Sequence, residues 1–500
     1  MKYVLIVLTA FTLVSCAKKQ EQPNILFVFA DQLRSHELAC YGGVNIETPN
    51  LDRLAKEGLQ LTNAISTYPI CSPFRGMLMT GSYPMHTGIV CNDHPLRDGL
   101  PSIAKACKAA DYQTAYIGKW HLDGIGRTTY IPPERRMGFE FWQALECTHS
   151  YFESKYFEND SEEQKQWEGY DAEAQTKSAQ NYIRNRDKNR PFFLMLSWGP
   201  PHDPYIAPEK YMKRVDPGKL ILRSNLKEKE IENELVTNMR FNLHNNIENK
   251  RTPGRMNLAD EEYVRKNMLH GYLAATLAID DYFGELLKTL EEEEILDNTI
   301  IVFTSDHGDH LGSHRFRGKC TPFEESISIP FLIRYPEKIS QKTISDALLA
   351  PIDMMPTILG MAGVSYPQID GEDLSKVITH KKSDTRDEIL IMGMTHLNTA
   401  SLVNSLDTWR GLRTKQYTYA RYEDQSAWLL YDNKKDPYQM NNLADDPEYT
   451  DLINEFNRKL DLLLKEAGDE ENTKKLYDII IEEKSTYLLR KLREVNPDRF

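Results

Sequence analysis

The chain has 500 residues, 40% of them hydrophobic, which is enough apolar material for one large α/β domain with a smaller lobe. It carries 61 Lys and Arg against 74 Asp and Glu, a formal net charge of -13. This acidic balance excludes nucleic acid held by a general basic surface, so an anionic substrate has to be captured by a local group of cations.

The amino-terminal segment predicts export. An apolar run at residues 4–14 is too short to span a bilayer permanently and is typical of a cleaved signal. It ends in Leu-Val-Ser-Cys at residues 13–16, a pattern that resembles the lipobox of bacterial lipoproteins. We therefore expect a signal peptide over residues 1–16, a tether over 17–23 and a lipid anchor at Cys16. The protein would be held at the periplasmic face of a membrane, with the cell surface as the less favoured face and an ordinary secretory signal as the alternative.

Four short apolar runs predict strands that are covered on both faces, as in a parallel sheet flanked by helices. Polar residues follow each run at once, and the carboxyl ends of parallel strands are where open α/β sheets place their sites. The runs are residues 25–30, 113–117, 192–196 and 299–303, followed by Asp31 and Gln32, by Gly118, Lys119 and His121, by Pro200, Pro201 and His202, and by Ser305, Asp306 and His307.

Amphipathic patterns at residues 48–58 and 272–294 predict helices that cross over between these strands. Residues 210–267 are polar and charged, and we expect a mostly helical insertion over the site there. A loop that runs over the surface in contact with solvent is an equal alternative.

The residue pattern of the chain changes near residue 386, which predicts a second lobe. Short strand-like pieces follow it, then a helix at residues 447–467 and a charged, helical tail. We expect a catalytic domain over residues 24–385 and a carboxy-terminal α+β subdomain with an antiparallel sheet over 386–500.

The sharpest local pattern begins at Cys71. Pro73 suits the first turn of a helix and Gly81 its exit, so Cys71 is expected at a helix amino terminus, where backbone amides favour an anion. With Arg75 and Thr80, the stretch resembles the sulfatase signature Cys-x-Pro-x-Arg followed by Thr-Gly, whose cysteine is oxidised to formylglycine. A buried free cysteine would account for Cys71 alone.

Five further segments resemble the formylglycine-dependent sulfatases of the alkaline phosphatase superfamily, in the family's order and over most of the chain. The resemblance implies an alkaline phosphatase-like fold, with a large mixed and mostly parallel sheet flanked by helices. It also implies sulfuric ester hydrolase activity and a formylglycine-generating enzyme as maturation partner. The segments are residues 24–33, Gly-Lys-Trp-His at 118–121, Pro-Pro-His at 200–202, Thr-Ser-Asp-His-Gly at 304–308 with Lys319 twelve residues beyond His307, and residues 430–443.

The resemblance also implies one divalent metal ion, held by Asp31, Gln32, Asp306, His307 and the formylglycine made from Cys71. Many members carry Asp where this chain has Gln32 and Asn where it has His307, and both variants occur in enzymes that attack phosphonate esters. Oxygen ligands suit Ca²⁺, which analogy favours, whereas the imidazole moves the preference toward Mg²⁺ or Mn²⁺.

Cleavage of a sulfate ester needs a strong nucleophile, positive groups around the sulfate and a proton for the leaving oxygen. The resemblance implies that the nucleophile is a hydroxyl of hydrated formylglycine at residue 71. We expect Asp306 to take its proton and Arg75, one helical turn on, to point at the same hydroxyls. The other roles fall to Lys119 and Lys319 as sulfate ligands, to His202 or Lys319 as the acid for the leaving oxygen, and to His121 as the group that regenerates the aldehyde.

Other polar residues are weaker candidates, and the five remaining cysteines are odd in number and imply no full disulfide framework. The other histidines, His149 among them, are interpreted as structural or surface positions. Candidates for lining the entrance of the substrate site are His310, His314, Arg315 and Arg317; that they are only exposed loop residues is an equal alternative. Candidates for contacting the sugar ring are His396, Trp409, Arg410 and Arg413, although Trp409 also fits a core position.

We therefore predict an exported sulfatase that acts on a sulfated sugar within a glycan. The alternative among enzymes is a phosphonate monoester or phosphodiester hydrolase on the same scaffold. From another class, an inactive lipoprotein that binds sulfated glycans is the competing hypothesis, but a pure binder has no need of the full set of catalytic residues.

Overall fold

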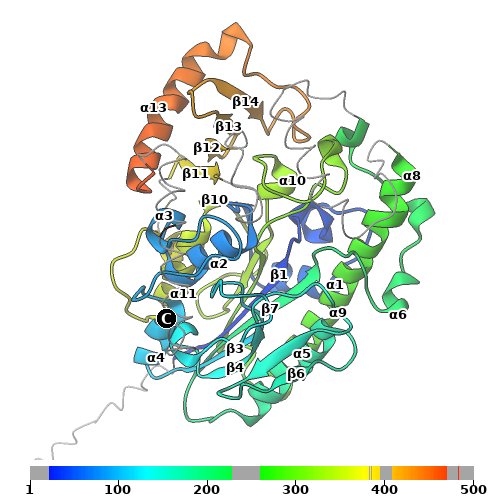
Figure 1. The fold of residues 1–500 in the computed structure, drawn as a ribbon, viewed down its shortest axis with the longest axis vertical. Coiled ribbons are helices and arrows are strands. Elements are labelled where there is room, and N and C mark those ends of the chain that lie inside the picture. The colour runs from blue at the N-terminus through cyan, green and yellow to red at the C-terminus, as the bar shows by residue number, and fades with distance from the viewer. Residues whose placement is uncertain are drawn as a thin grey trace, which may run out of the picture.

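The computed structural model describes residues 22–227, 260–381, 383, 386–394, 408–469 and 482, organised around two separate β-sheets (Figure 1). The signal peptide, Cys16, most of the tether, the middle of the expected insertion and most of the charged tail lie outside the described residues. No helix within the described ranges combines the length and the apolar content that crossing a bilayer requires.

The larger sheet is mixed and mostly parallel, as predicted. In spatial order its strands are β10 (Thr343–Leu349), β2 (Leu59–Ala64), β9 (Phe331–Arg334), β8 (Thr299–Ser305), β1 (Asn24–Asp31), β7 (Phe192–Pro201), β3 (Gln113–Lys119), β4 (Phe141–Leu145), β5 (Lys155–Glu158) and β6 (Gln164–Gln166). The centre from β8 to β4 is parallel, whereas β9 runs against both of its neighbours and β5 and β6 form an antiparallel edge. The four predicted apolar runs are the adjacent strands β8, β1, β7 and β3, which are almost wholly buried.

Helices cover both faces of this sheet, which explains why the central strands are apolar throughout. One face packs against α1 (Pro49–Glu57), α5 (Asp171–Asn185) and α9 (His270–Glu292). The other packs against α2 (Cys71–Thr80), α4 (Ile103–Ala109) and α11 (Pro351–Ala362). The helices predicted from the amphipathic patterns are α1 and α9.

The carboxy-terminal part forms the predicted antiparallel sheet, at the top of Figure 1. Its strands are β11 (Glu388–Gly393), β12 (Trp409–Thr414), β13 (Tyr417–Arg421) and β14 (Ala427–Asp432), and α13 (Thr450–Glu466) packs beside them. A third apolar core joins this sheet to Ile70 and Met77, in and just before α2. The second lobe therefore supports the helix that begins at Cys71.

Short helices fill the connections, and the six cysteines among the described residues are all free. These helices are η1 (Ser35–Glu37), η2 (Ala39–Tyr41), α3 (Pro84–Thr87), η3 (Pro133–Arg135), α6 (Glu209–Met212), η4 (Pro217–Lys219), η5 (Ser224–Lys227), α8 (Glu261–Val264), η6 (Arg265–Leu269), η7 (Ser313–Arg315), α10 (Glu324–Ile327), α12 (Ser375–Ile378) and η10 (Pro447–Tyr449).

Candidate active site

The central strands deliver polar side chains to one edge of the large sheet. Asp31 is the last residue of β1 and Lys119 the last residue of β3. His202 follows β7 directly, and Asp306 and His307 follow β8. Because these strands are parallel neighbours, their carboxyl ends meet at the same edge. All five side chains are buried there.

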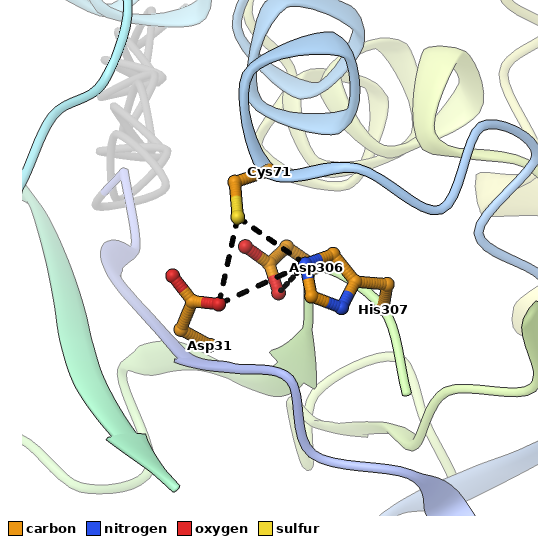
Figure 2. Close-up of side chains that lie close together, drawn as sticks. All are labelled: Asp31, Cys71, Asp306 and His307. Carbon is orange, nitrogen blue, oxygen red and sulfur yellow. Dashed lines mark hydrogen bonds and ion pairs between the residues drawn. The ribbon is translucent and has the colours of Figure 1, made fainter. Parts of the chain in front are cut away.

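Four side chains point toward one another at this edge (Figure 2): Asp31, Cys71, Asp306 and His307, whose possible ligand atoms all lie within 4.8 Å of one another. Cys71 is the first residue of α2, the predicted helix amino terminus. Its Sγ lies 3.3 Å from His307 Nε2 and 3.7 Å from Asp31 Oδ1. His307 Nε2 lies 3.4 Å from Asp306 Oδ1. Two carboxylates, an imidazole and the side chain of residue 71 therefore face one small volume.

The hydrogen bonding of His307 explains why this volume suits a cation. Its Nδ1 lies 3.1 Å from the carbonyl oxygen of Gly308, which can only accept, so Nδ1 carries the proton. Burial, helped by the charge of Lys319, lowers the pKa of His307 to about 4 and keeps the ring neutral. The lone pair of Nε2 then faces two carboxylates, an arrangement of acceptors that a divalent cation would satisfy. The residues present thus fit the predicted metal centre.

Gln32 contributes an amide oxygen on the side of this cluster. Lys319 Nζ donates to Gln32 Oε1 at 2.8 Å and to Cys71 Sγ at 3.1 Å, while Gln32 Nε2 donates to the carboxylate of Asp309. The hydroxyl of Tyr205 donates to the same carboxylate at 2.7 Å. Asp309 therefore orients the amide of Gln32. No sequence motif singled out Asp309, although it lies only two residues beyond His307.

Three cations, Arg75, Lys119 and Lys319, surround the cluster. Arg75 Nη2 lies 3.3 Å from the carboxylate of Asp31 and 3.1 Å from that of Asp306, two contacts that its predicted role toward residue 71 did not include. Lys119 Nζ lies 2.5 Å from Asp31 Oδ2. Burial lowers the pKa of each cation, but the facing anionic groups outweigh it and raise the pKa above its ordinary value. All three stay charged, so the site can hold an anion by local cations in an acidic protein.

The three cations also affect the protonation of the carboxylates. Burial raises the pKa of Asp31, but the nearby cations, Lys119 first among them, outweigh it and hold that pKa well below its ordinary value. Asp31 is therefore ionised over the physiological range, as a metal ligand has to be.

His121 is held by a side chain that the sequence analysis did not single out. Its Nε2 lies 3.1 Å from Asp93 Oδ1, and Arg127 donates to the same carboxylate at 3.1 Å and 3.0 Å. Burial and the charge of Lys119 lower the pKa of His121. The ring is thus neutral and oriented, ready to exchange a proton.

His202 lies against a second histidine that the sequence analysis interpreted as structural. The rings of His149 and His202 are stacked, and Tyr151 donates to the carbonyl oxygen of His202 at 2.7 Å. Nδ1 of His202 lies 2.7 Å from the carbonyl oxygen of Asp203, so Nδ1 carries a proton and Nε2 remains as the exchangeable position. Burial, Lys319 and His149 lower the pKa of His202 well below its ordinary value. A nearby anion is therefore needed to protonate Nε2.

The weaker candidates separate into two groups. Arg317 lies beside the site, because its Nη2 is 3.1 Å from Asp203 Oδ2, next to His202. Five of the others contact groups in the protein core or the second lobe, and His396 lies outside the described residues. His310 bonds to Thr321, His314 stacks on Phe323, Trp409 is a core residue that donates to the carbonyl oxygen of Cys320, Arg410 pairs with Asp469, and Arg413 pairs with Glu324.

Comparison with known proteins gives consistent matches over nearly the whole chain. A family model described as Sulfatase matches residues 23–364, and one described as N-sulphoglucosamine sulphohydrolase, C-terminal, matches residues 312–466. The chain is 38% identical over 487 residues to an ulvan-active sulfatase of Formosa agariphila, covering 94% of this chain and 88% of the relative. It is 30% identical over 515 residues to an endo-4-O-sulfatase of Bacteroides thetaiotaomicron, covering 92% and 95%. A solved structure in complex with its substrate, D-glucosamine-2-N,6-O-disulfate, superposes with a TM-score of 0.76 at 28% identity, covering 91% of this chain and 99% of that one.

Proposed function

This chain belongs to the sulfatase family and is a sulfuric ester hydrolase, and from that premise we propose that it removes sulfate from saccharides of a glycan, with a formylglycine made from Cys71 and one divalent cation. The observation that carries the proposal is the buried meeting of Cys71 with two carboxylates and His307, enclosed by three cations.

The position of Cys71 supports its conversion to formylglycine by a maturation enzyme. Its Sγ marks where the oxygens of formylglycine would lie, at the amino terminus of α2 and beside Asp31 and His307. The formylglycine would supply the nucleophilic hydroxyl, and the cation would supply positive charge that makes this hydroxyl more acidic. We propose Asp31, Gln32, Asp306, His307 and the modified residue 71 as ligands, with Ca²⁺ as the first choice of ion and Mg²⁺ or Mn²⁺ as the alternatives.

The remaining polar residues have roles that follow from their charges and contacts. We propose that the ammonium groups of Lys119 and Lys319 bind the oxygens of the sulfate, since both are buried and charged. Arg75 binds both carboxylates and holds them in place. Asp306 is the proposed proton acceptor for the attack, and the neutral ring of His121 the proton acceptor for the release of sulfate.

A sugar alkoxide is a poor leaving group and needs a proton as its bond to sulfur breaks. We propose His202 as the donor of this proton from Nε2, because a bound sulfate would raise the pKa of a ring that is otherwise kept neutral. Lys319 is the alternative donor, since it is charged and contacts Cys71 Sγ.

The substrate class is supported by the relatives. One relative acts on ulvan, a second is an endo-4-O-sulfatase, and a solved neighbour binds a sulfated glucosamine. We propose a sulfated saccharide as the substrate, with ulvan oligosaccharides as the first to be tried. We also propose export with lipid attachment at Cys16, a catalytic domain over residues 24–385 and a subdomain over 386–500.

The test is a comparison of kcat/KM across a defined panel, with protein co-produced with a formylglycine-generating enzyme. The panel contains ulvan oligosaccharides, 4-O-sulfated oligosaccharides and N-acetylglucosamine-6-O-sulfate, beside an aryl phosphonate and a phosphodiester. We expect one of the sulfated saccharides to give the highest kcat/KM. A preference for the phosphonate or the phosphodiester would establish the alternative enzyme on this scaffold. Binding without any turnover by the matured protein would favour the glycan-binding lipoprotein.

A further inference from the structure

A groove lies at the far edge of the large sheet, between α5 and the β5–β6 hairpin. Figure 1 labels α5 and β6 in its lower part. The volume of the groove is about 750 Å³, and β4 lines it as well. None of its lining residues belongs to the candidate active site. The groove is therefore a second concave surface, separate from the metal cluster, and we call it the α5 groove.

One stripe of α5 forms a wall of the α5 groove. Helix α5 has 15 residues, which corresponds to a length of about 22 Å. The adjoining side of the helix contacts α9, where Gln180 donates to Thr289 and Arg184 pairs with Glu292. The stripe recurs every three or four residues and consists of Glu173, Ala174, Lys177, Ser178, Asn181, Tyr182 and Asn185.

Aromatic rings line the α5 groove beside the helix. The rings of Tyr156 and Trp167 are stacked with centroids 3.9 Å apart, and Phe141 and Tyr182 lie 5.0 Å apart. The hydroxyl of Tyr182 is buried and has no hydrogen-bond partner among the described residues. A buried hydroxyl without a partner is costly, so it favours a ligand that brings a donor or an acceptor into the groove.

Four of the eight non-aromatic polar residues that line the α5 groove are neutral amides. Gln166, Asn181 and Asn185 are exposed side chains that can both donate and accept hydrogen bonds. Aromatic faces next to such amides suit a ring that is apolar on its faces and carries hydroxyls at its edge. That combination describes a sugar.

The charges of the α5 groove differ from those of the active site. Lys177 is the one cation among its lining residues, and its Nζ lies 2.8 Å from a carboxylate oxygen of Glu173. Glu168 adds an exposed negative charge. The lining therefore disfavours a sulfate group and favours an uncharged stretch of saccharide.

Two tyrosines connect one end of the α5 groove to the active site. Tyr170 lines this end, and its ring lies 6.2 Å from that of Tyr151 in an edge-to-face contact. Tyr151 in turn donates to the carbonyl oxygen of His202. We propose that the α5 groove is a second, non-catalytic saccharide site, which binds an unsulfated stretch of the glycan whose sulfate ester reacts at Cys71. The proposal rests on the saccharide substrate proposed above.

The test fills the α5 groove and measures binding and turnover separately. Asn181→Trp places a large ring on the groove stripe, and Asn189→Trp, at an exposed position beyond the end of α5, is the matched control. Binding is measured with full-length protein carrying Cys71→Ala, by affinity electrophoresis in gels that contain ulvan or chemically desulfated ulvan. We expect Asn181→Trp to weaken binding to desulfated ulvan at least about tenfold and the control to leave it unchanged.

Turnover supplies the second readout. In the matured enzyme, Asn181→Trp should raise KM for long sulfated oligosaccharides several-fold while leaving kcat/KM for a sulfated monosaccharide unchanged. Gln166→Ala, at an exposed strand position, repeats the test with a smaller change if Asn181→Trp lowers the melting temperature.

Two results would overturn the inference. One is the absence of binding to either form of ulvan by the Cys71→Ala protein with an intact groove, and the other is identical behaviour of the groove and control variants. Turnover of sulfated saccharides with no effect of the groove variants would reject the second site alone. A lack of turnover on every sulfated saccharide would reject the proposed function, and the binding experiment would still report on the groove.

Discussion

The imidazole ring of His149 lies parallel to that of His202, with the ring centroids 4.3 Å apart and the ring planes inclined by 9°. Two positively charged rings at this separation would repel each other, so only one of them can carry a second proton. Burial and the charge of Lys119 lower the pKa of His149 to about 3. Burial, with the charges of Lys319 and His149, also lowers the pKa of His202 well below its ordinary value, so both rings are neutral until an anion binds. We propose that His202, which directly follows β7, is the ring that then gains the proton, with His149 stacked against it.

The first prediction concerns His202 as the acid for the leaving oxygen. His202→Ala should reduce kcat on an unactivated sugar sulfate about 10²- to 10⁴-fold, the usual worth of general acid catalysis. It should reduce kcat on an activated aryl sulfate far less, because a phenolate leaves without a proton. His149→Phe, which keeps a ring against His202, is the control and should keep most of the activity on both substrates. Equal losses on the two substrates would remove His202 from this role and leave Lys319 as the acid.

The second prediction concerns the maturation of Cys71. Protein produced with a formylglycine-generating enzyme should contain an aldehyde at residue 71, and peptide mass analysis measures the converted fraction. Activity should rise in proportion to that fraction. Cys71→Ala should lose nearly all turnover. It should keep the melting temperature, because residue 71 is the first residue of α2 and the second lobe packs against this helix. An active sample with only an unmodified thiol at residue 71 would rule out the proposed nucleophile.

The sequence predicts the centre of the molecule better than its edges. The strands β8, β1, β7 and β3 are continuous apolar runs because both of their faces are covered, and this pattern can be recognised without a partner strand. Residues Gln164–Gln166 form β6 without one apolar residue, since that strand lies at the solvent-exposed edge of the sheet. No periodicity predicts such a strand.

The same division holds within the candidate site. Residues at the carboxyl ends of the central strands, such as Asp31 and His307, are predicted by their position alone. Asp93, His149 and Asp309 lie in loops, and tertiary packing brings them to His121, His202 and Gln32. Their sequence neighbourhoods contain no signal that separates them from other loop residues.

The third prediction concerns the metal. Removal of divalent ions with a chelator should abolish activity, and adding back Ca²⁺, Mg²⁺ or Mn²⁺ singly should identify the ion. Asp306→Asn should lower both the bound metal, measured by elemental analysis, and the turnover, because it removes one negative charge from the cluster. Gln32→Asp adds a negative charge and should tighten divalent binding. Full activity in a sample shown to be free of metal would exclude this site.

The fourth prediction concerns Cys16, which lies outside the described residues. Labelled fatty acid should enter the wild-type protein and should not enter Cys16→Ala. The variant should also appear in the soluble fraction after cell breakage, because it lacks the lipid anchor. Label that persists in Cys16→Ala would point to another site of attachment.

The last prediction concerns Glu146, a buried carboxyl group that contacts the backbone just after His121. Its carboxylate accepts hydrogen bonds from the backbone amides of Leu122, Asp123 and Gly124, at 3.2, 2.8 and 2.7 Å. Burial, together with the charge of Asp123, raises the pKa of Glu146 to about 8 despite these donors. In the unfolded chain the pKa returns to about 4.3, the ordinary value for a glutamic acid.

Between these two values the folded protein holds a proton that the unfolded chain has released. Folding stability therefore falls as the pH rises from about 4.3 to about 8, by at most about 1.4 kcal/mol per pH unit from this group. Below this window Glu146 is neutral in both states, so its contribution to stability is fully present there. Glu146→Gln cannot titrate. Its amide nitrogen faces a backbone N–H that a carboxyl oxygen of Glu146 accepts in the wild type, and leaving this donor unsatisfied costs about 1 kcal/mol at low pH.

The variant should consequently be less stable than the wild type at pH 5 and equal or superior to it at pH 8. Urea unfolding curves at intervals of half a pH unit measure this difference. Glu163→Gln, at an exposed position, is the matched control and should follow the wild type at every pH. If the free energies of unfolding of the wild type and Glu146→Gln run parallel from pH 5 to pH 8, Glu146 is ionised throughout and the three backbone donors outweigh its burial.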